Sequence, residues 1–212
     1  MELRDALRER RSVKHFDADH QMPDSELRTL LRHTMHAPTS FNMQNWHFIA
    51  VRDQEVKTAL WESSWRQNQV RDASVVIVIA GRMDAITDVD RFFRHLPDGP
   101  RQDLTDMAKQ FYAVENTEIN RDEGCRTAGL AGMALMLMAK DMGYDSCPMI
   151  GFDPAGVSKA IGLPDNHPPL LLVTVGKAAT PAQPRMGFLN YQDVVSSDRF
   201  GQQLFEGEIE EL

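Results

Sequence analysis

The chain has 212 residues, with 31 acidic and 23 basic side chains, which gives a formal net charge of -8. This acidic balance argues against a nucleic-acid-binding protein, whose surface would carry a basic excess. Hydrophobic residues make up 42% of the chain and charged residues 25%, which is typical of a globular protein with a sizeable core. We therefore expect a single domain spanning residues 1–212.

The sequence shows no feature of export or membrane insertion. Its first 16 residues are charged and lack the apolar segment of a signal peptide. The longest apolar runs, residues 75–80 and 170–175, are too short to cross a bilayer. We expect a soluble cytoplasmic protein with no membrane partner. Cys125 and Cys147 do not match a metal-binding spacing, so we expect two free thiols, with a single disulfide as the alternative.

The pattern of apolar and turn-forming residues predicts alternating helices and strands. In chain order, we expect a helix over residues 1–10, a loop over 11–22, a helix over 23–35, a break at 38–42, a strand over 46–51, a helix over 54–62, a strand over 75–80, a helix over 118–142 ending at Gly143, a short helix from 153 to 162, and a strand over 170–176. All three strands are expected inside the sheet, and the long helix is expected to be buried on most sides. The result is an α+β domain.

Two parts of the chain are less regular. Residues 84–110 give no clear pattern, and residues 95–100 are expected to form a loop. From residue 177 onward the chain turns polar and irregular, and it finishes with a charged segment at residues 206–212.

Arg10, Arg11, Ser12 and Lys14 form the first segment with chemical potential. Guanidinium groups bind phosphate through paired, charge-assisted hydrogen bonds, and a lysine supplies a point charge where an anion develops. The segment follows a predicted helix and therefore lies in a loop. A solvated basic turn is the alternative interpretation.

Residues 38–46, with the sequence PTSFNMQNW, form the second such segment. Its amide and hydroxyl groups suit hydrogen bonds to the edge of a heteroaromatic ring. The alternative is an ordinary turn that leads into a buried strand, with Trp46 in the core.

Residues 147–153, with the sequence CPMIGFD, form the third segment. Pro148 fixes the backbone, and Gly151 lets it approach a ligand closely. Backbone N–H groups at this point could donate to a ring nitrogen. The alternative is a simple turn before the helix that begins near Pro154.

In this order and spacing, the three segments resemble the FMN-binding signature of the nitroreductase family. RRSVKHF at residues 10–16 matches the family's R-R-S-x-R/K-x-F, and APTSFNMQNW at residues 37–46 matches A-P-S-S-x-N-x-Q-P-W. Four further features match the family: DASV, the G-x-x-x-x-P-x-x-G-F-D pattern at residues 143–153, a strand ending in V-G, and the late Arg185. The resemblance covers nearly the whole chain apart from residues 84–110. Each motif alone is weak, whereas their joint order is specific.

The resemblance implies a fold and an assembly: a central mixed sheet flanked by helices, in an intertwined homodimer that holds FMN between its subunits. It implies that Arg10, Arg11 and Ser12 bind the phosphate and ribityl chain, with Arg185 completing the phosphate site. It also places Lys14 near the N1–C2=O edge of the flavin, where its charge would stabilise the reduced cofactor.

The remaining contacts are also taken from the resemblance. The second subunit is expected to contribute four residues to the flavin site, namely Pro38, Thr39, Ser40 and Asn42. The backbone after Pro148, around Ile150 and Gly151, is expected to donate to flavin N5 and O4. Gln69 is a candidate for the pyrimidine edge of the ring. Phe41 is bulky beside the expected substrate face, so we expect it to narrow the substrate pocket.

The implied activity is electron transfer from NADH or NADPH through FMN to a small electron-poor acceptor, such as a nitroaromatic compound or a quinone. The flavin carries the chemistry, and no side-chain nucleophile or metal is expected. Alternatives with the same fold are dehalogenation, degradation of the flavin itself, or oxidation of enone-like substrates. A non-enzymatic FMN-binding protein is a further alternative. The sequence does not choose between NADH and NADPH.

Overall fold

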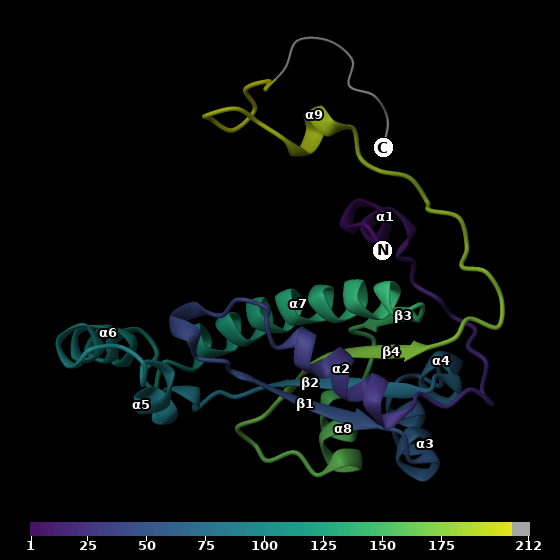
Figure 1. The fold of residues 1–212 in the computed structure, drawn as a ribbon, viewed down its shortest axis with the longest axis horizontal. Coiled ribbons are helices and arrows are strands. Elements are labelled where there is room, and N and C mark those ends of the chain that lie inside the picture. Colours follow the sequence, from purple (N-terminus) through teal and green to yellow (C-terminus); the bar gives the residue numbers. More distant parts are fainter. Residues whose placement is uncertain (205–212) are drawn as a thin grey trace. The chain divides into compact units, whose positions relative to one another are not determined.

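The computed structural model describes residues 1–204 and divides into two compact units, Met1–Ala182 and Gln183–Leu212. The first unit carries a four-stranded sheet with helices on both faces (Figure 1). Within its described part, the second unit is mostly irregular and contains the short helix α9, Tyr191–Val194. The charged segment expected at residues 206–212 lies outside the described residues.

The sheet has the strand order β1-β2-β4-β3, and its paired strands all run antiparallel. The strands are β1 Trp46–Val51, β2 Val75–Gly81, β3 Asp145–Met149 and β4 Pro169–Gly176. Among the described residues, one parallel bridge joins Ser12 to Ser146 of β3, and the mixed character of the sheet rests on that bridge. The expected α+β class is confirmed.

Helices cover both faces of this sheet (Figure 1). One face packs against α2, Asp24–Thr34, and the long helix α7, Thr117–Asp141. The other face packs against α3, Gln54–Ser63, and α8, Pro154–Ile161. Because side chains alternate between the faces of a strand, Ile77 and Ile79 face α7 whereas Val76 and Val78 face α3 and α8. Both cores meet at β2, which is buried along its whole length.

The remaining elements are short or lie beside the sheet. They are α1 Leu3–Glu9, the 3-10 turn η1 Ser40–Asn42, α4 Asn68–Asp72, the 3-10 turn η2 Ala85–Asp88, α5 Val89–Phe92 and α6 Asp98–Phe111. Asp53 and Asp153 cap α3 and α8 through their carboxylates, which accept from two backbone N–H groups each. Gly143 follows α7 with a φ of 74°, so the expected helix end is confirmed.

The structure corrects four sequence-based expectations. Strand β1 lies at an edge of the described sheet and not inside it. Strand β3 includes Cys147, Pro148 and Met149, where no strand was expected and a turn was the alternative interpretation. The expected loop at residues 95–100 ends early, because α6 begins at Asp98. Helix α7 is also less enclosed than expected, since Leu130 on its outer face is 48% exposed.

Two chemical expectations can also be compared with the structure. Cys125 and Cys147 are both free thiols, the first exposed and the second buried, so the disulfide alternative is wrong. Across residues 1–204, no helix combines the length and the apolar character that crossing a membrane requires.

Candidate active site

The first sequence segment runs beside the free edge of β3. Ser12 forms the parallel bridge to Ser146, and the Val13 N–H donates to the Ser146 carbonyl at 3.0 Å. Val13 is buried with Phe16 and Ala73, which anchors the segment. Because side chains alternate along an extended chain, Ser12 and Lys14 point away from Val13 and are exposed. The structure therefore presents a hydroxyl and an ammonium group side by side along this edge.

Cys147 of β3 lies beneath this segment and is fully buried. Burial raises the pKa of its thiol, while the positive charge of Lys14, its hydrogen bond and the charge of Arg10 act in the opposite direction. The structure thus brings Arg10, Ser12 and Lys14 together around one side chain. A buried, protonated thiol is a poor nucleophile, so Cys147 is not expected to attack a substrate.

The third segment begins within β3 and continues past its end at Met149. Met149 is buried, whereas the next residue, Ile150, is 82% exposed. Trp65 lies against Gly151 so closely that a Cβ there would be 2.7 Å from the Trp65 ring. In the described part of the chain, no hydrogen bond uses the Gly151 N–H. That N–H is therefore available to an acceptor on a ligand.

Two glutamines continue the site from Gly151. The Gln67 side-chain amide donates to the Gly151 carbonyl at 3.0 Å, and the Gln69 amide donates to the Gln67 side-chain oxygen at 3.0 Å. Gln69 is only 4% exposed. Gln69 was expected at the site from the sequence, whereas Gln67 was not. Gln67 lies two residues before Gln69 and also precedes β2, and this proximity is the signal that could have indicated it.

The second segment is held by local hydrogen bonds and by the region before α7. The Thr39 hydroxyl accepts from the Gln44 N–H at 3.1 Å, and the Asn42 amide donates to the Phe92 carbonyl at 3.2 Å. The Tyr112 hydroxyl donates to Ser40 at 2.9 Å. Phe41 has a φ of 51° and meets the Tyr112 ring edge to face, with ring centroids 5.9 Å apart. Phe41 therefore packs against the end of α6.

The first and second segments lie at opposite edges and opposite ends of the sheet (Figure 1). Ser12 adjoins Ser146, which is in register with Val175 and, through it, with the start of β2. Trp46, the last residue of the second segment, pairs with Gly81 at the end of β2. Neighbouring strands are about 4.8 Å apart, so the two edges are roughly 14 Å apart across the sheet, with a further offset of roughly 20 Å along it. One chain does not bring these segments together.

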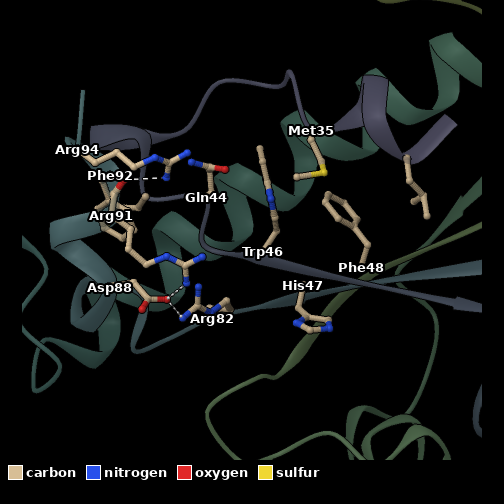
Figure 2. A pocket seen from close by; sticks show the side chains of 12 residues that line it. Met35, Gln44, Trp46, His47, Phe48, Arg82, Asp88, Arg91, Phe92 and Arg94 are labelled. Atoms are coloured by element: carbon tan, nitrogen blue, oxygen red, sulfur yellow. Dashed lines mark hydrogen bonds and ion pairs between the residues drawn. The ribbon is translucent and has the colours of Figure 1, made fainter. Parts of the chain in front are cut away.

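A cavity of about 410 Å³ opens beside the second segment. Figure 2 shows the Arg82 and Arg91 side chains converging on Asp88, with Arg94 beside Gln44. An oxygen of Asp88 lies 2.7 Å from Arg82 and 3.7 Å from Arg91. The hydrogen bond from Arg82 is the main reason that the pKa of Asp88 lies below its usual value. The remaining lining is largely apolar and aromatic: Leu31, Met35, Met43, Trp46, Phe48 and Phe92, with His47.

Arg185 belongs to the second unit, where its guanidinium lies over the Phe188 ring at 5.5 Å from the centroid. The expected role of Arg185 at a phosphate stays a prediction. Pro38 lies before η1 and Pro148 lies within β3, and their expected contacts with the flavin stay predictions.

Comparisons with known proteins confirm the family resemblance. Residues 7–177 match the Nitroreductase family. Protein DrgA of Synechocystis sp. is 40% identical over 178 residues, which cover 84% of each chain. An NADH dehydrogenase of Thermus thermophilus is 30% identical over 191 residues, covering 87% of this chain and 90% of that protein.

A solved structure points the same way. A candidate nitroreductase from Exiguobacterium sibiricum, in complex with FMN, has a TM-score of 0.85 at 26% identity, covering 93% of this chain and 97% of the other. Together with the sheet order and the segments around β3, these similarities place the chain in the nitroreductase family.

Proposed function

We propose that the protein is an FMN-dependent oxidoreductase that passes electrons from NAD(P)H to small electron-poor acceptors, with nitroaromatic compounds and quinones as the expected classes. The observation that carries this proposal is the group of cations and hydroxyl along the β3 edge, followed by the exposed Ile150 and the Gly151 N–H. Family membership and the relative described as a nitroreductase in complex with FMN support the same activity.

The donors on this edge fit the parts of FMN. Arg10, Arg11 and Ser12 offer charge-assisted bonds to a phosphate and a hydroxyl for the sugar-like chain. Lys14 lies two residues further on, toward the ring, and the Gly151 N–H supplies a donor for a ring nitrogen or oxygen. When bound, FMN supplies the electron transfer, and these residues bind and orient it.

The opposite positions of the first two segments support a homodimer. The hydroxyl groups of Thr39 and Ser40, the side-chain amide of Asn42 and the ring of Pro38 lie too far from Lys14 to serve the same cofactor within one chain. In a second copy, the same groups would complete the flavin site. The outer edge of β1 is unpaired among the described residues and borders an apolar hollow lined by Ile49 and Val56. Such an edge favours coverage by another chain.

The test is an absorbance spectrum of the purified protein, followed by heat release and chromatography of the chromophore. We expect FMN at about one per subunit, and NAD(P)H oxidation that depends on an added quinone. A colourless protein that also fails to bind added FMN would contradict the proposal. Bound FMN without turnover would instead favour a flavin-binding protein, and loss of flavin in the presence of oxygen would favour flavin degradation.

Replacing Lys14 with alanine is expected to lower the reduction potential of bound flavin while leaving most of the FMN affinity intact. A positive charge near the ring favours the more negatively charged, reduced cofactor. The potential is measured by equilibration with a reference dye. The matched variant Lys14→Arg keeps the charge and should keep the potential. An unchanged potential in Lys14→Ala would remove this role from the lysine.

A further inference from the structure

The cavity beside the second segment carries a local excess of positive charge in an acidic protein. Three arginines line it, Arg82, Arg91 and Arg94, and Asp88 is the one acidic residue among the described residues of the lining. Asp88 is shared between Arg82 and Arg91. Arg94 donates to the Arg91 carbonyl at 3.2 Å, and no ion pair involves Arg94 in the described part of the chain. Three positive charges against one negative charge leave room for a doubly charged anion.

The walls of the cavity also suit a planar group. Trp46 and Phe48 form an aromatic pair with ring centroids 5.5 Å apart. Phe92 also lines the cavity and lies between Arg91 and Arg94 in the sequence. Guanidinium planes stack on aromatic rings as well as bind phosphate. Gln44 also lines the cavity (Figure 2). Its side-chain N–H groups donate to the Asn42 carbonyl and side-chain oxygen at 3.3 and 3.2 Å, and its own side-chain oxygen adds an acceptor. The lining therefore matches a heteroaromatic ring attached to a phosphate.

The position of the cavity connects it to the flavin site. Gln44 and Trp46 line it and belong to the second segment, which the homodimer would place beside the flavin of its partner. A reductant must bring its nicotinamide ring to that flavin, so its other half would extend over neighbouring protein surface. NADPH differs from NADH by a 2′-phosphate on its adenosine half, which is a dianion at neutral pH.

We propose that this cavity binds the adenosine 2′-phosphate half of NADPH and makes NADPH the preferred reductant. The inference rests on the proposed function. Arg91 and Arg94 hold the phosphate, since the Arg91 side chain is 73% exposed and Arg94 has no carboxylate partner among the described residues. Arg82, which follows the end of β2, forms an ion pair with Asp88 and is part of the cavity wall.

Isothermal titration calorimetry on the purified holoprotein tests the site without turnover. Adenosine 2′,5′-bisphosphate should bind at least about tenfold more tightly than adenosine 5′-monophosphate, the gain expected from a charge-assisted contact. The preference should weaken with added salt, because the arginines are partly exposed. The double variant R91A/R94A should lose it. The matched variant Arg101→Ala, on α6 and outside the lining, should retain it.

Equal affinity for the two nucleotides, or a preference that survives in the double variant, would overturn the inference. Benzoate can be titrated as a second probe. If it binds in a way that depends on Arg91 and Arg94 but competes with neither nucleotide, the arginines serve an acidic acceptor, and the inference is also overturned. Failure here is distinct from failure of the proposed function. An FMN-loaded enzyme that uses NADH and NADPH equally refutes only the reductant site, whereas a protein that binds no FMN refutes the activity itself.

Discussion

FMN affinity is expected to fall about 30-fold when Arg10 is replaced with alanine, which corresponds to about 2 kcal/mol. Arg10 lies near Lys14 and Cys147 at the β3 edge, where its charge acts on the Cys147 thiol. A guanidinium there supplies a charge-assisted bond to the cofactor phosphate that alanine cannot replace. Titration of the flavin-free protein with FMN, followed by flavin fluorescence, measures the loss.

The matched control is Arg4→Ala, which removes an exposed arginine from α1, six residues earlier. That variant should bind FMN as the wild type does. Equal affinity in wild type and Arg10→Ala would remove Arg10 from the phosphate site. The same titration on Arg185→Ala tests whether the second unit contributes to this site.

Replacing Leu135 with alanine is expected to lower the free energy of unfolding by about 3 kcal/mol. Leu135 lies on α7, is fully buried, and belongs to the core cluster that includes Leu30 of α2 and Ile77 of β2. Removing its side chain loses buried apolar surface and leaves a cavity between helix and sheet. Urea unfolding of the flavin-free protein at a fixed protein concentration gives the change, because bound cofactor and dimer formation both shift apparent stability.

Leu130→Ala is the matched control on the same helix, since Leu130 is 48% exposed. Its effect on unfolding in the same experiment should be within about 0.5 kcal/mol. A loss at Leu130 as large as that at Leu135 would mean that the outer face of α7 is buried in solution. A negligible loss at Leu135 would contradict the described packing.

Elements with continuous apolar runs could be predicted from the sequence. β2 and β4 are central strands, so their side chains are buried on both faces and the sequence shows it. β3 could not be read in this way because it is five residues long and contains Asp145, Ser146 and Pro148. Its strand character comes from pairing with β4 and with Ser12, contacts that are distant in sequence.

The sequence indicated the segments of the site but not their arrangement. The resemblance identified the first and third segments, which the structure brings together at β3. The arginine-lined cavity lay outside prediction because Arg91 and Arg94 fall in the stretch that gave no clear pattern. Helix α6 was missed in the same stretch, since the sequence DGP at its start is more typical of a turn, although proline is tolerated in a first helical turn.

The placement of the first two segments at opposite edges of the sheet has a genetic consequence. In the proposed homodimer each flavin takes Arg10 from one chain and Asn42 from the other. When a chain altered only at Arg10 pairs with a chain altered only at Asn42, one of the two sites inherits both defects and the other is wholly intact. The two altered chains would therefore complement each other when they are produced together. In each mixed dimer, up to half of the flavin sites would be functional.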